Sequence, residues 1–310
     1  MRSMEVMTVE RLKVNNLKIT ADDSLLDQMK EVIHQCPKAI KYCKSLGMSD
    51  EDIDSNVIKI YDFARDINYC SNCPGLKECK KENAYLTSKV TFNNGVVETQ
   101  LIPCPTLLKR VSFERQFLIQ DFPNEWLDVT MPELDRTKGR TKATVVYNKY
   151  IKNEETNWIY LTGGMRSGKS YYAAAMVIDL AKRELKGKVP ICFMNASKRI
   201  LELSDLNKKN NEEFKKKLEQ YCTVPVLVID DFGHEFKNDF IRDAIVNEII
   251  SSRYNKRLFT VFTSNFSLDE IEVLYECNSK AGAIMSKQIV KTIRSMCGQE
   301  VDLGDLAIYQ

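Results

Sequence analysis

Residues 163–170, G-G-M-R-S-G-K-S, have the types and spacing of a phosphate-binding loop. Four residues separate Gly163 from Gly168, and Lys169 and Ser170 follow, which fits the pattern G-x-x-x-x-G-K-[ST]. Glycines let the backbone approach a phosphate with its N–H groups turned inward, and the N-terminus of a following helix adds partial positive charge. The pattern therefore predicts a site for a nucleoside triphosphate, and ATP is the nucleotide we expect.

Each position of this loop has an expected role with ATP and Mg²⁺. Lys169 is expected to act catalytically by neutralising the β and γ phosphates, and Ser170 to bind Mg²⁺ through its hydroxyl. We expect nucleotide contacts along the whole loop and at the next residue: Gly163, Gly164, Met165, Arg166, Ser167, Gly168, Lys169, Ser170 and Tyr171. The alternative, a glycine-rich turn without a ligand, is disfavoured because the flanking residues predict a strand before the loop and a helix after it.

Polar side chains that end two later apolar runs supply the rest of the predicted catalytic site. Residues 226–229, V-L-V-I, lead into Asp230 and Asp231, and the run L-F-T-V-F-T-S-N ends at Asn265. A carboxylate at the end of a buried strand can reach Mg²⁺, so Asp230 is the predicted magnesium-side ligand, through water. Asp231 is the predicted group that polarises the attacking water. Asn265 either orients this water or caps the following helix, because Asn favours such positions too.

Cysteines cluster in the first third of the chain. Cys70 and Cys73 have the two-residue gap at which two thiolates can bind one tetrahedral zinc ion, and Cys79 and Cys104 are the expected remaining ligands. The site would be structural, because four thiolates leave no open position for water. A C-x-x-C redox pair and free buried thiols are the alternatives. We interpret the cysteines of the C-terminal half as small buried apolar residues.

Strands and helices must bring the nucleotide-site residues together, and the C-terminal half predicts both. Apolar, strand-like runs alternate with helical stretches from W-I-Y-L-T at residues 158–162 to a last helix over residues 285–296. This alternation predicts an α/β fold, in which a parallel sheet is flanked by helices. Because parallel strands end at the same edge of a sheet, we expect Asn265 to lie at the carboxyl edge beside the aspartates.

The N-terminal part has a different pattern, which predicts a separate, smaller domain. Helical periodicity extends over residues 24–65, and two strand-like stretches meet at Asn93-Asn94-Gly95, a strong hairpin signal. The 310 residues exceed the usual size of a single core. We therefore predict a helical, zinc-binding domain over residues 1–110, a linker over 111–125 and an ATP-binding domain over 126–310.

Charge and hydropathy narrow the classes of partner. Lys and Arg number 45 and Asp and Glu 43, so the net charge of +2 gives no overall attraction to nucleic acid, and DNA contacts need a local patch. Lys198, Arg199 and the lysines at 215–217 are candidate contacts, although the glutamates around the lysine run favour a solvated helix face there. The sequence shows neither a signal peptide nor a run of 18 apolar residues, so we expect a cytoplasmic protein without membrane contact.

Taken together, C-S-N-C, the phosphate loop, V-I-D-D-F-G, S-S-R-Y and T-S-N-F-S resemble the bacterial replicative helicase loaders of the DnaC/DnaI type over nearly the whole chain. This resemblance implies an AAA+ ATPase domain that binds ATP and single-stranded DNA, and a zinc-bearing N-terminal domain that binds the hexameric replicative helicase. It places Lys169 and Ser170 on Walker A, Asp230 and Asp231 on Walker B, and Asn265 on sensor 1. The implied function is ATP-dependent loading of the helicase during initiation of DNA replication, with self-assembly around the nucleotide.

Two departures from the family pattern affect these expectations. The family carries a histidine ligand after its first cysteines, and this chain has none there, so Cys79 is assigned instead. The late motif K-Q-I-V-K-T-I-R has Gln288 and Thr292 where the family has arginines, which leaves Arg253 and Arg294 as candidate arginine finger or sensor. Because such an arginine contributes much of the rate, a nucleotide-gated helicase adaptor with little ATP turnover stays open as an alternative. The ATPase partner of a transposase, which uses a similar nucleotide domain, is a further alternative.

Overall fold

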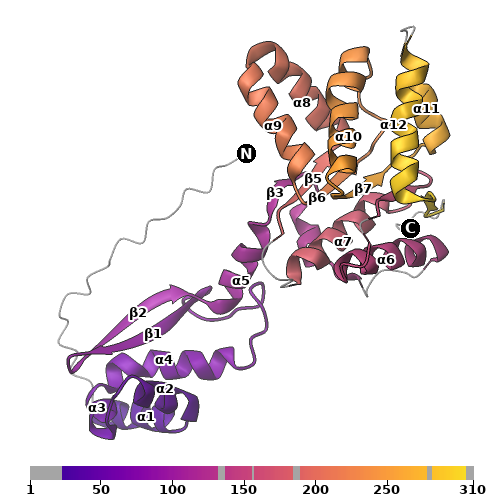
Figure 1. Cartoon of the computed structure of the whole chain (residues 1–310). Coiled ribbons are helices and arrows are strands. Elements are labelled where there is room, and N and C mark those ends of the chain that lie inside the picture. The colour runs from indigo at the N-terminus through magenta and orange to yellow at the C-terminus, as the bar shows by residue number, and fades with distance from the viewer. Residues whose placement is uncertain (1–22, 132–136, 156, 184–188, 278–280, 305–310) are drawn as a thin grey trace. The chain divides into compact units, whose positions relative to one another are not determined.

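The computed structural model describes residues 23–131, 137–155, 157–183, 189–277 and 281–304. The chain divides into two compact units, Met1–Arg110 and Val111–Gln310 (Figure 1). Each unit has its own hydrophobic core and is considered by itself. Every helix in the described ranges is too short or too polar to span a membrane.

From residue 23 on, the first unit contains helices and a hairpin: α1 (Asp23–His34), α2 (Pro37–Ser45), α3 (Asp50–Ser55), α4 (Val57–Cys70), β1 (Leu86–Asn93) and β2 (Val96–Pro103). The predicted helices and hairpin are confirmed. Asn94 and Gly95 form the two-residue turn with φ of +51° and +76°, and the residues that flank the turn, Asn93 and Val96, pair across the strands. Positive φ at both turn positions matches the twist of the strands, which explains the preference for Asn-Gly.

The second unit is an α/β domain whose strands include β4 (Ile159–Thr162), β5 (Ile191–Asn195), β6 (Val226–Asp230) and β7 (Phe259–Thr263). With β3 (Phe117–Gln120) and β8 (Val301–Asp302) they form a parallel sheet in the order β3-β5-β6-β7-β4-β8. The helical segments are α5 (Pro105–Glu114), which spans the boundary between the units, then η1 (Asn124–Asp128), α6 (Lys138–Ile151), α7 (Lys169–Lys182), α8 (Ala196–Lys209), α9 (Asn211–Thr223), the π-helix η3 (Ile241–Val246), α10 (Asn247–Asn255), α11 (Leu268–Tyr275) and α12 (Gly282–Cys297).

Residues 111–125 are part of the second unit, so the prediction that they form a linker was wrong. They contribute the end of α5, the edge strand β3 and the start of η1. Strand β3 pairs in parallel with β5, through Phe117 opposite Ile191 and Gln120 opposite Phe193. The short strand has no strong alternation of its own, and it exists because β5 offers a partner edge.

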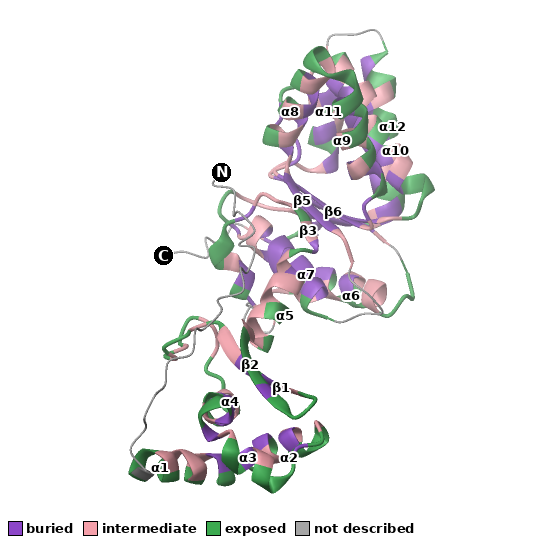
Figure 2. Ribbon diagram, turned by 90° about the vertical axis from the view of Figure 1, so that its left-hand side faces the viewer, coloured by how far each residue is buried: buried purple, intermediate pink, exposed green. Residues whose placement is uncertain are grey.

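Helices cover both faces of the sheet, as Figure 2 shows by the buried strands between half-buried helices. Alternate strand residues point to opposite faces. On β6, Val226 and Val228 belong to the core with α6 and α7, whereas Leu227 and Ile229 belong to the core with α8 to α12. The predicted parallel sheet flanked by helices is therefore confirmed.

Candidate nucleotide-binding site

The sheet order brings three loops to one edge. Strand β7 lies between β6 and β4, and all three strands run parallel. The phosphate loop follows β4, Asp230 ends β6 with Asp231 directly after it, and Asn265 follows β7. The residues that sequence analysis selected from three distant segments therefore meet at the carboxyl edge of the sheet, where open α/β folds bind their ligands.

The glycines of the phosphate loop occupy backbone positions that other residues rarely adopt. Gly163 has φ of +140° and Gly168 has φ of +81°, and Gly168 directly precedes α7. A Cβ atom on Gly163 would lie 2.9 Å from the carbonyl oxygen of Gly304 and 3.2 Å from a carboxylate oxygen of Asp302. The tight turn therefore needs glycine, and it directs the N-terminus of α7 toward the interior of the loop.

The ammonium group of Lys169 lies inside this loop. The side chain is buried, and Nζ donates to the carbonyl oxygens of Gly163 at 2.9 Å and Gly164 at 2.7 Å. The hydroxyl oxygen of Ser167 lies 3.4 Å from the same nitrogen. An ammonium group in this position is suited to bind a phosphate, because phosphate oxygens are stronger acceptors than these carbonyl oxygens.

Asp230 is the most strongly perturbed acid of the site. Its side chain is 6% exposed, and the Thr263 hydroxyl donates to Oδ1 at 2.6 Å. Burial raises its pKa from 3.8 to about 6, against the lowering effect of hydrogen bonds from Thr263 and Ser170. A buried carboxylate next to the Ser170 hydroxyl is a donor set that fits Mg²⁺, since this cation prefers oxygen ligands.

Replacing Asp230 by asparagine is expected to stabilise the nucleotide-free protein. The folded carboxyl binds its proton with a pKa of about 6, above the ordinary 3.8, so the wild type loses stability as the pH rises through this range. At pH 7.5 we expect Asp230→Asn to raise the free energy of unfolding by on the order of 1–3 kcal/mol, a gain that shrinks below pH 6.

Tryptophan fluorescence during urea unfolding measures this change in the second unit, because both tryptophans, Trp126 and Trp158, belong to it. Asp205→Asn on the exposed surface of α8 is the control, with an expected change below about 0.5 kcal/mol. A variant Asp230→Asn less stable than the wild type at pH 7.5 would contradict the prediction.

Asp231 and Asn265 are held by hydrogen bonds that sequence analysis did not foresee. Asp231 has φ of +56°, its N–H donates to the Thr263 hydroxyl at 3.0 Å, and Asn195 donates to its carboxylate at 3.2 Å. The amide nitrogen of Asn265 lies 2.9 Å from Nε2 of His234. Asn265 does not cap the following helix, since Ser267 fills that position. Asn195 and His234 lie outside the motifs, and Thr263 was not singled out within T-S-N-F-S, although Asn195 and Thr263 each end a strand of the sheet.

Arg253 is a buried structural residue, so the prediction that it supplies an arginine finger or sensor was wrong. Its side chain is fully buried and donates to the carbonyl oxygens of Tyr221, Val224 and Phe259 at 2.6–2.9 Å, and to the Thr260 hydroxyl at 2.9 Å. These acceptors lie in the last turn of α9, between α9 and β6, and at the start of β7, so they are at the amino ends of the strands, opposite to the phosphate loop.

Arg294 lies on the surface of α12. Its guanidinium donates to Asp269 of α11 at 2.6 Å and lies 3.9 Å from Glu300. Its side chain is 42% exposed. That Arg294 acts as an arginine finger or sensor stays a prediction.

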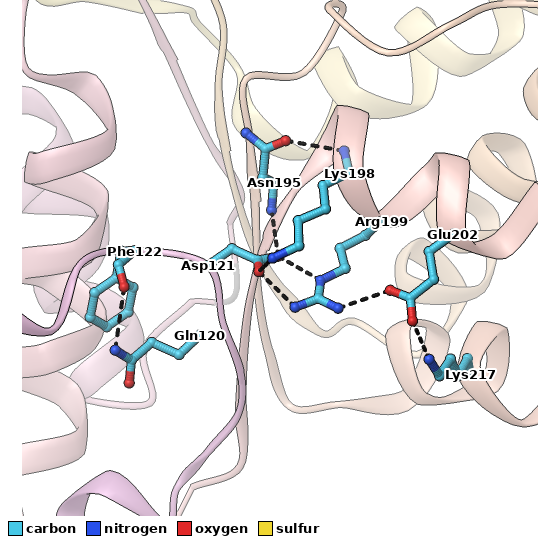
Figure 3. A network of polar contacts seen from close by, with 8 residues as sticks. All are labelled: Gln120, Asp121, Phe122, Asn195, Lys198, Arg199, Glu202 and Lys217. Atoms are coloured by element: carbon cyan, nitrogen blue, oxygen red, sulfur yellow. Dashed lines mark hydrogen bonds and ion pairs between the residues drawn. The ribbon is translucent and has the colours of Figure 1, made fainter. Parts of the chain in front are cut away.

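Lys198 and Arg199, the candidate DNA contacts, are engaged in an ion-pair network (Figure 3). Arg199 donates to both oxygens of Asp121 at 2.6 Å and to Glu202 at 2.8 Å, and Lys198 donates to Asp121 at 2.8 Å. Burial opposes ionisation of Asp121, but the bonds from Arg199 and Lys198 hold its pKa below the ordinary value. Lys217 continues the network through Glu202. A phosphate contact by Arg199 would have to replace these bonds.

The structure does not support the predicted zinc site. Among the described residues, no group of three or more His, Cys, Asp or Glu side chains is arranged to hold a metal ion. The thiols bind protein groups instead: Cys73 lies 3.6 Å from the Thr106 hydroxyl, and the sulfur of Cys104 accepts the N–H of Leu107 at 3.3 Å. Burial raises the pKa of the Cys70 thiol. Of the later cysteines, Cys192 and Cys222 are buried, and Cys277 and Cys297 are half-buried.

A parallel sheet with a phosphate loop and a buried aspartate at one edge defines an ATP-binding domain of the P-loop, AAA+-like class. Residues 128–294 match the IstB-like ATP binding protein family, and the chain belongs to this family. It is 24% identical over 288 residues to the replicative helicase loader DnaI of Bacillus subtilis (strain 168), with 87% of each chain covered.

Two solved structures of helicase loaders are also similar. A crystal structure of DnaI is 25% identical, with a TM-score of 0.49, over 59% of this chain and 95% of that chain. A crystal structure of the DnaC helicase loader is 23% identical, with a TM-score of 0.46, over 59% of this chain and 100% of that chain.

Proposed function

We propose that this protein loads a replicative DNA helicase onto single-stranded DNA at the initiation of replication, in a reaction that uses ATP. One observation carries the proposal: the likeness to the helicase loader DnaI extends over 288 residues, which is more than the second unit contains. The family match at residues 128–294 accounts only for ATP binding. Similarity across both units supports the function of the whole relative.

The nucleotide site supports ATP hydrolysis by named groups. The backbone amides of residues 163–170 and the Lys169 ammonium would hold the triphosphate, in place of the carbonyl oxygens that Lys169 now contacts. Ser170 and Asp230 would hold Mg²⁺, which supplies charge neutralisation when bound. Asp231 would polarise the attacking water, and Asn265 would orient it at the same sheet edge.

The partners follow from the same resemblance. The first unit would bind the hexameric helicase, and the second would contact single-stranded DNA and assemble with copies of itself around nucleotide. Arg294 would act as the arginine finger or sensor, because Arg253 is buried at the sheet edge opposite to the phosphate loop. Any DNA contact by Lys198 or Arg199 would compete with the ion pairs to Asp121. Because such a contact would be to phosphate, it would weaken as the salt concentration rises.

The experiment is a loading assay with the cognate replicative helicase, circular single-stranded DNA and ATP. We expect the full chain to copurify with the helicase and to increase the amount of helicase on DNA, and ATP to be required for the second step. Failure to bind the helicase would refute the proposal. Recovery of a transposase instead would favour the role of a transposase-partner ATPase, which the family match also allows.

A nucleotide-gated adaptor is the second candidate, and the absence of arginines at two positions of α12 favours it. Gln288 and Thr292 stand on α12 where the helicase loaders have arginines, and Arg253 cannot replace them because it is fully buried. An adaptor would bind the helicase in response to ATP and hydrolyse ATP hardly at all. ATP turnover that rises with single-stranded DNA and disappears in Lys169→Ala would exclude the adaptor.

A further inference from the structure

His234 makes a contact that neither the ATP-site motifs nor the family match accounts for. It lies in the loop after β6, and Nε2 of its imidazole is 2.9 Å from the amide nitrogen of Asn265, which follows β7. The ring also packs against Phe266, with 4.9 Å between the ring centroids. The contact therefore joins two loops at the carboxyl edge of the sheet, beside Asp231.

The backbone before His234 is fixed tightly. Gly233 has φ of +97°, and a Cβ atom on it would lie 2.6 Å from Ile271 and 2.8 Å from Phe266. The N–H of His234 donates to the carbonyl oxygen of Asp231 at 3.2 Å, which closes a turn. The imidazole is thus presented from a turn that admits only glycine at its bend, not from a freely moving loop.

The residue after His234 anchors the same turn from the other side. Glu235 is 2% exposed, and its carboxylate accepts the N–H of Gly233 at 2.9 Å. The hydroxyl of Tyr275, a buried residue at the end of α11, donates to the same carboxylate. With both neighbours held by buried contacts, the backbone that carries the exposed His234 side chain is held by the core of the domain.

We propose that His234 is a positioning residue that fixes the orientation of the Asn265 side-chain amide for ATP hydrolysis. A neutral imidazole with its proton on Nδ1 accepts a hydrogen bond at Nε2, so it binds the NH₂ end of the amide. The Oδ1 end of Asn265 is then left to accept a hydrogen bond from water. Without His234 the amide is free to rotate, and its donor and acceptor ends exchange. This inference rests on the proposed ATP hydrolysis and on the role of Asn265 in it.

Steady-state ATP hydrolysis by the full chain tests this role. We expect His234→Ala to lower kcat about 2- to 10-fold, the range for one neutral hydrogen bond, with KM for ATP changed less than about twofold. His234→Gln should restore most of the rate, because its terminal amide reaches the place of Nε2. His234→Asn should not, because its shorter amide reaches only the place of Nδ1. His34→Ala, in the first unit, removes the other histidine as a control.

A double-variant cycle separates positioning from a general disturbance of the loop. In an Asn265→Ala background, His234→Ala should lower kcat by less than about a further 1.5-fold, since no amide is left to orient. The inference is overturned if His234→Ala lowers kcat equally in both backgrounds. It is also overturned if Gln and Asn at this position give the same rate.

A spectroscopic measurement distinguishes failure of this inference from failure of the proposed function. The NH₂ signal of Asn265 in a ¹H–¹⁵N spectrum of the nucleotide-free protein is assigned by its loss in Asn265→Ala. We expect this signal to move in His234→Ala and to stay near its wild-type position in His234→Gln. An unmoved signal overturns the inference whatever the turnover. A wild type without turnover refutes the proposed hydrolysis, and with it the catalytic part of the inference.

Discussion

Replacement of Lys169 by alanine is expected to lower kcat/KM for ATP by at least about 100-fold, the range seen when one preorganised charge-stabilising group is lost. The ammonium is buried inside the phosphate loop and donates to the carbonyl oxygens of Gly163 and Gly164. Without it, the triphosphate would lose a positive charge that is already held in place inside the loop. Steady-state ATP hydrolysis measures the loss of rate, and the shift of the melting temperature by Mg·ATP measures the loss of binding.

Lys142→Ala is the matched control for this change, because it removes the same type of side chain from the exposed surface of α6. It should hydrolyse ATP like the wild type. Lys169→Ala should stay folded, as judged by circular dichroism, because the substitution also removes a charge that was buried. Wild-type turnover in Lys169→Ala would show that ATP binds elsewhere, and the site described above would then be wrong.

Replacement of Arg253 by methionine is expected to destabilise the second unit by about 3–5 kcal/mol, since each buried acceptor left unpaired costs on the order of 1–3 kcal/mol. The guanidinium joins the end of α9 and the residue after it to the start of β7, through three carbonyl oxygens and the Thr260 hydroxyl. Methionine fills similar volume but donates no hydrogen bond. Urea unfolding followed by the fluorescence of Trp126 and Trp158 measures the loss.

Two further variants sharpen this test. Arg257→Met, on the exposed turn before β7, should change the free energy of unfolding by less than about 0.5 kcal/mol. Arg253→Lys should recover only part of the stability, because one ammonium cannot reach the four acceptors that the planar guanidinium reaches. A loss of ATP turnover without loss of stability in Arg253→Met would contradict the structural role and revive a role in catalysis.

Much of the fold could be predicted because its signals are local. The alternation of strands and helices in the second unit, the helices of residues 24–65 and the Asn94-Gly95 hairpin each depend on periodicity or turn chemistry within a few residues. The phosphate loop is local in the same sense, because its glycines, Lys169 and Ser170 are adjacent. Such patterns survive in the folded chain because the local preference and the tertiary environment agree.

Elements whose stability depends on distant partners were missed. Strand β3 consists of four residues and pairs with β5, about seventy residues later in the chain. Strand β8, Val301–Asp302, is still shorter and is defined by its pairing with β4. Neither strand has enough residues for an alternating pattern to appear. For this reason the edge strand β3 was predicted as part of a linker over residues 111–125. Short edge strands are determined by the partner strand rather than by their own composition.

The residues alone predicted a nucleoside triphosphate site, because the phosphate loop and the aspartates at the end of an apolar run can be recognised from neighbouring residues. Only the tertiary structure decided which side chains surround them. It placed Arg253 in the core and away from the site, left the four cysteines without a metal-binding arrangement, and set His234 against Asn265. Such contacts depend on how segments far apart in the sequence pack together, so no local sequence pattern predicts them.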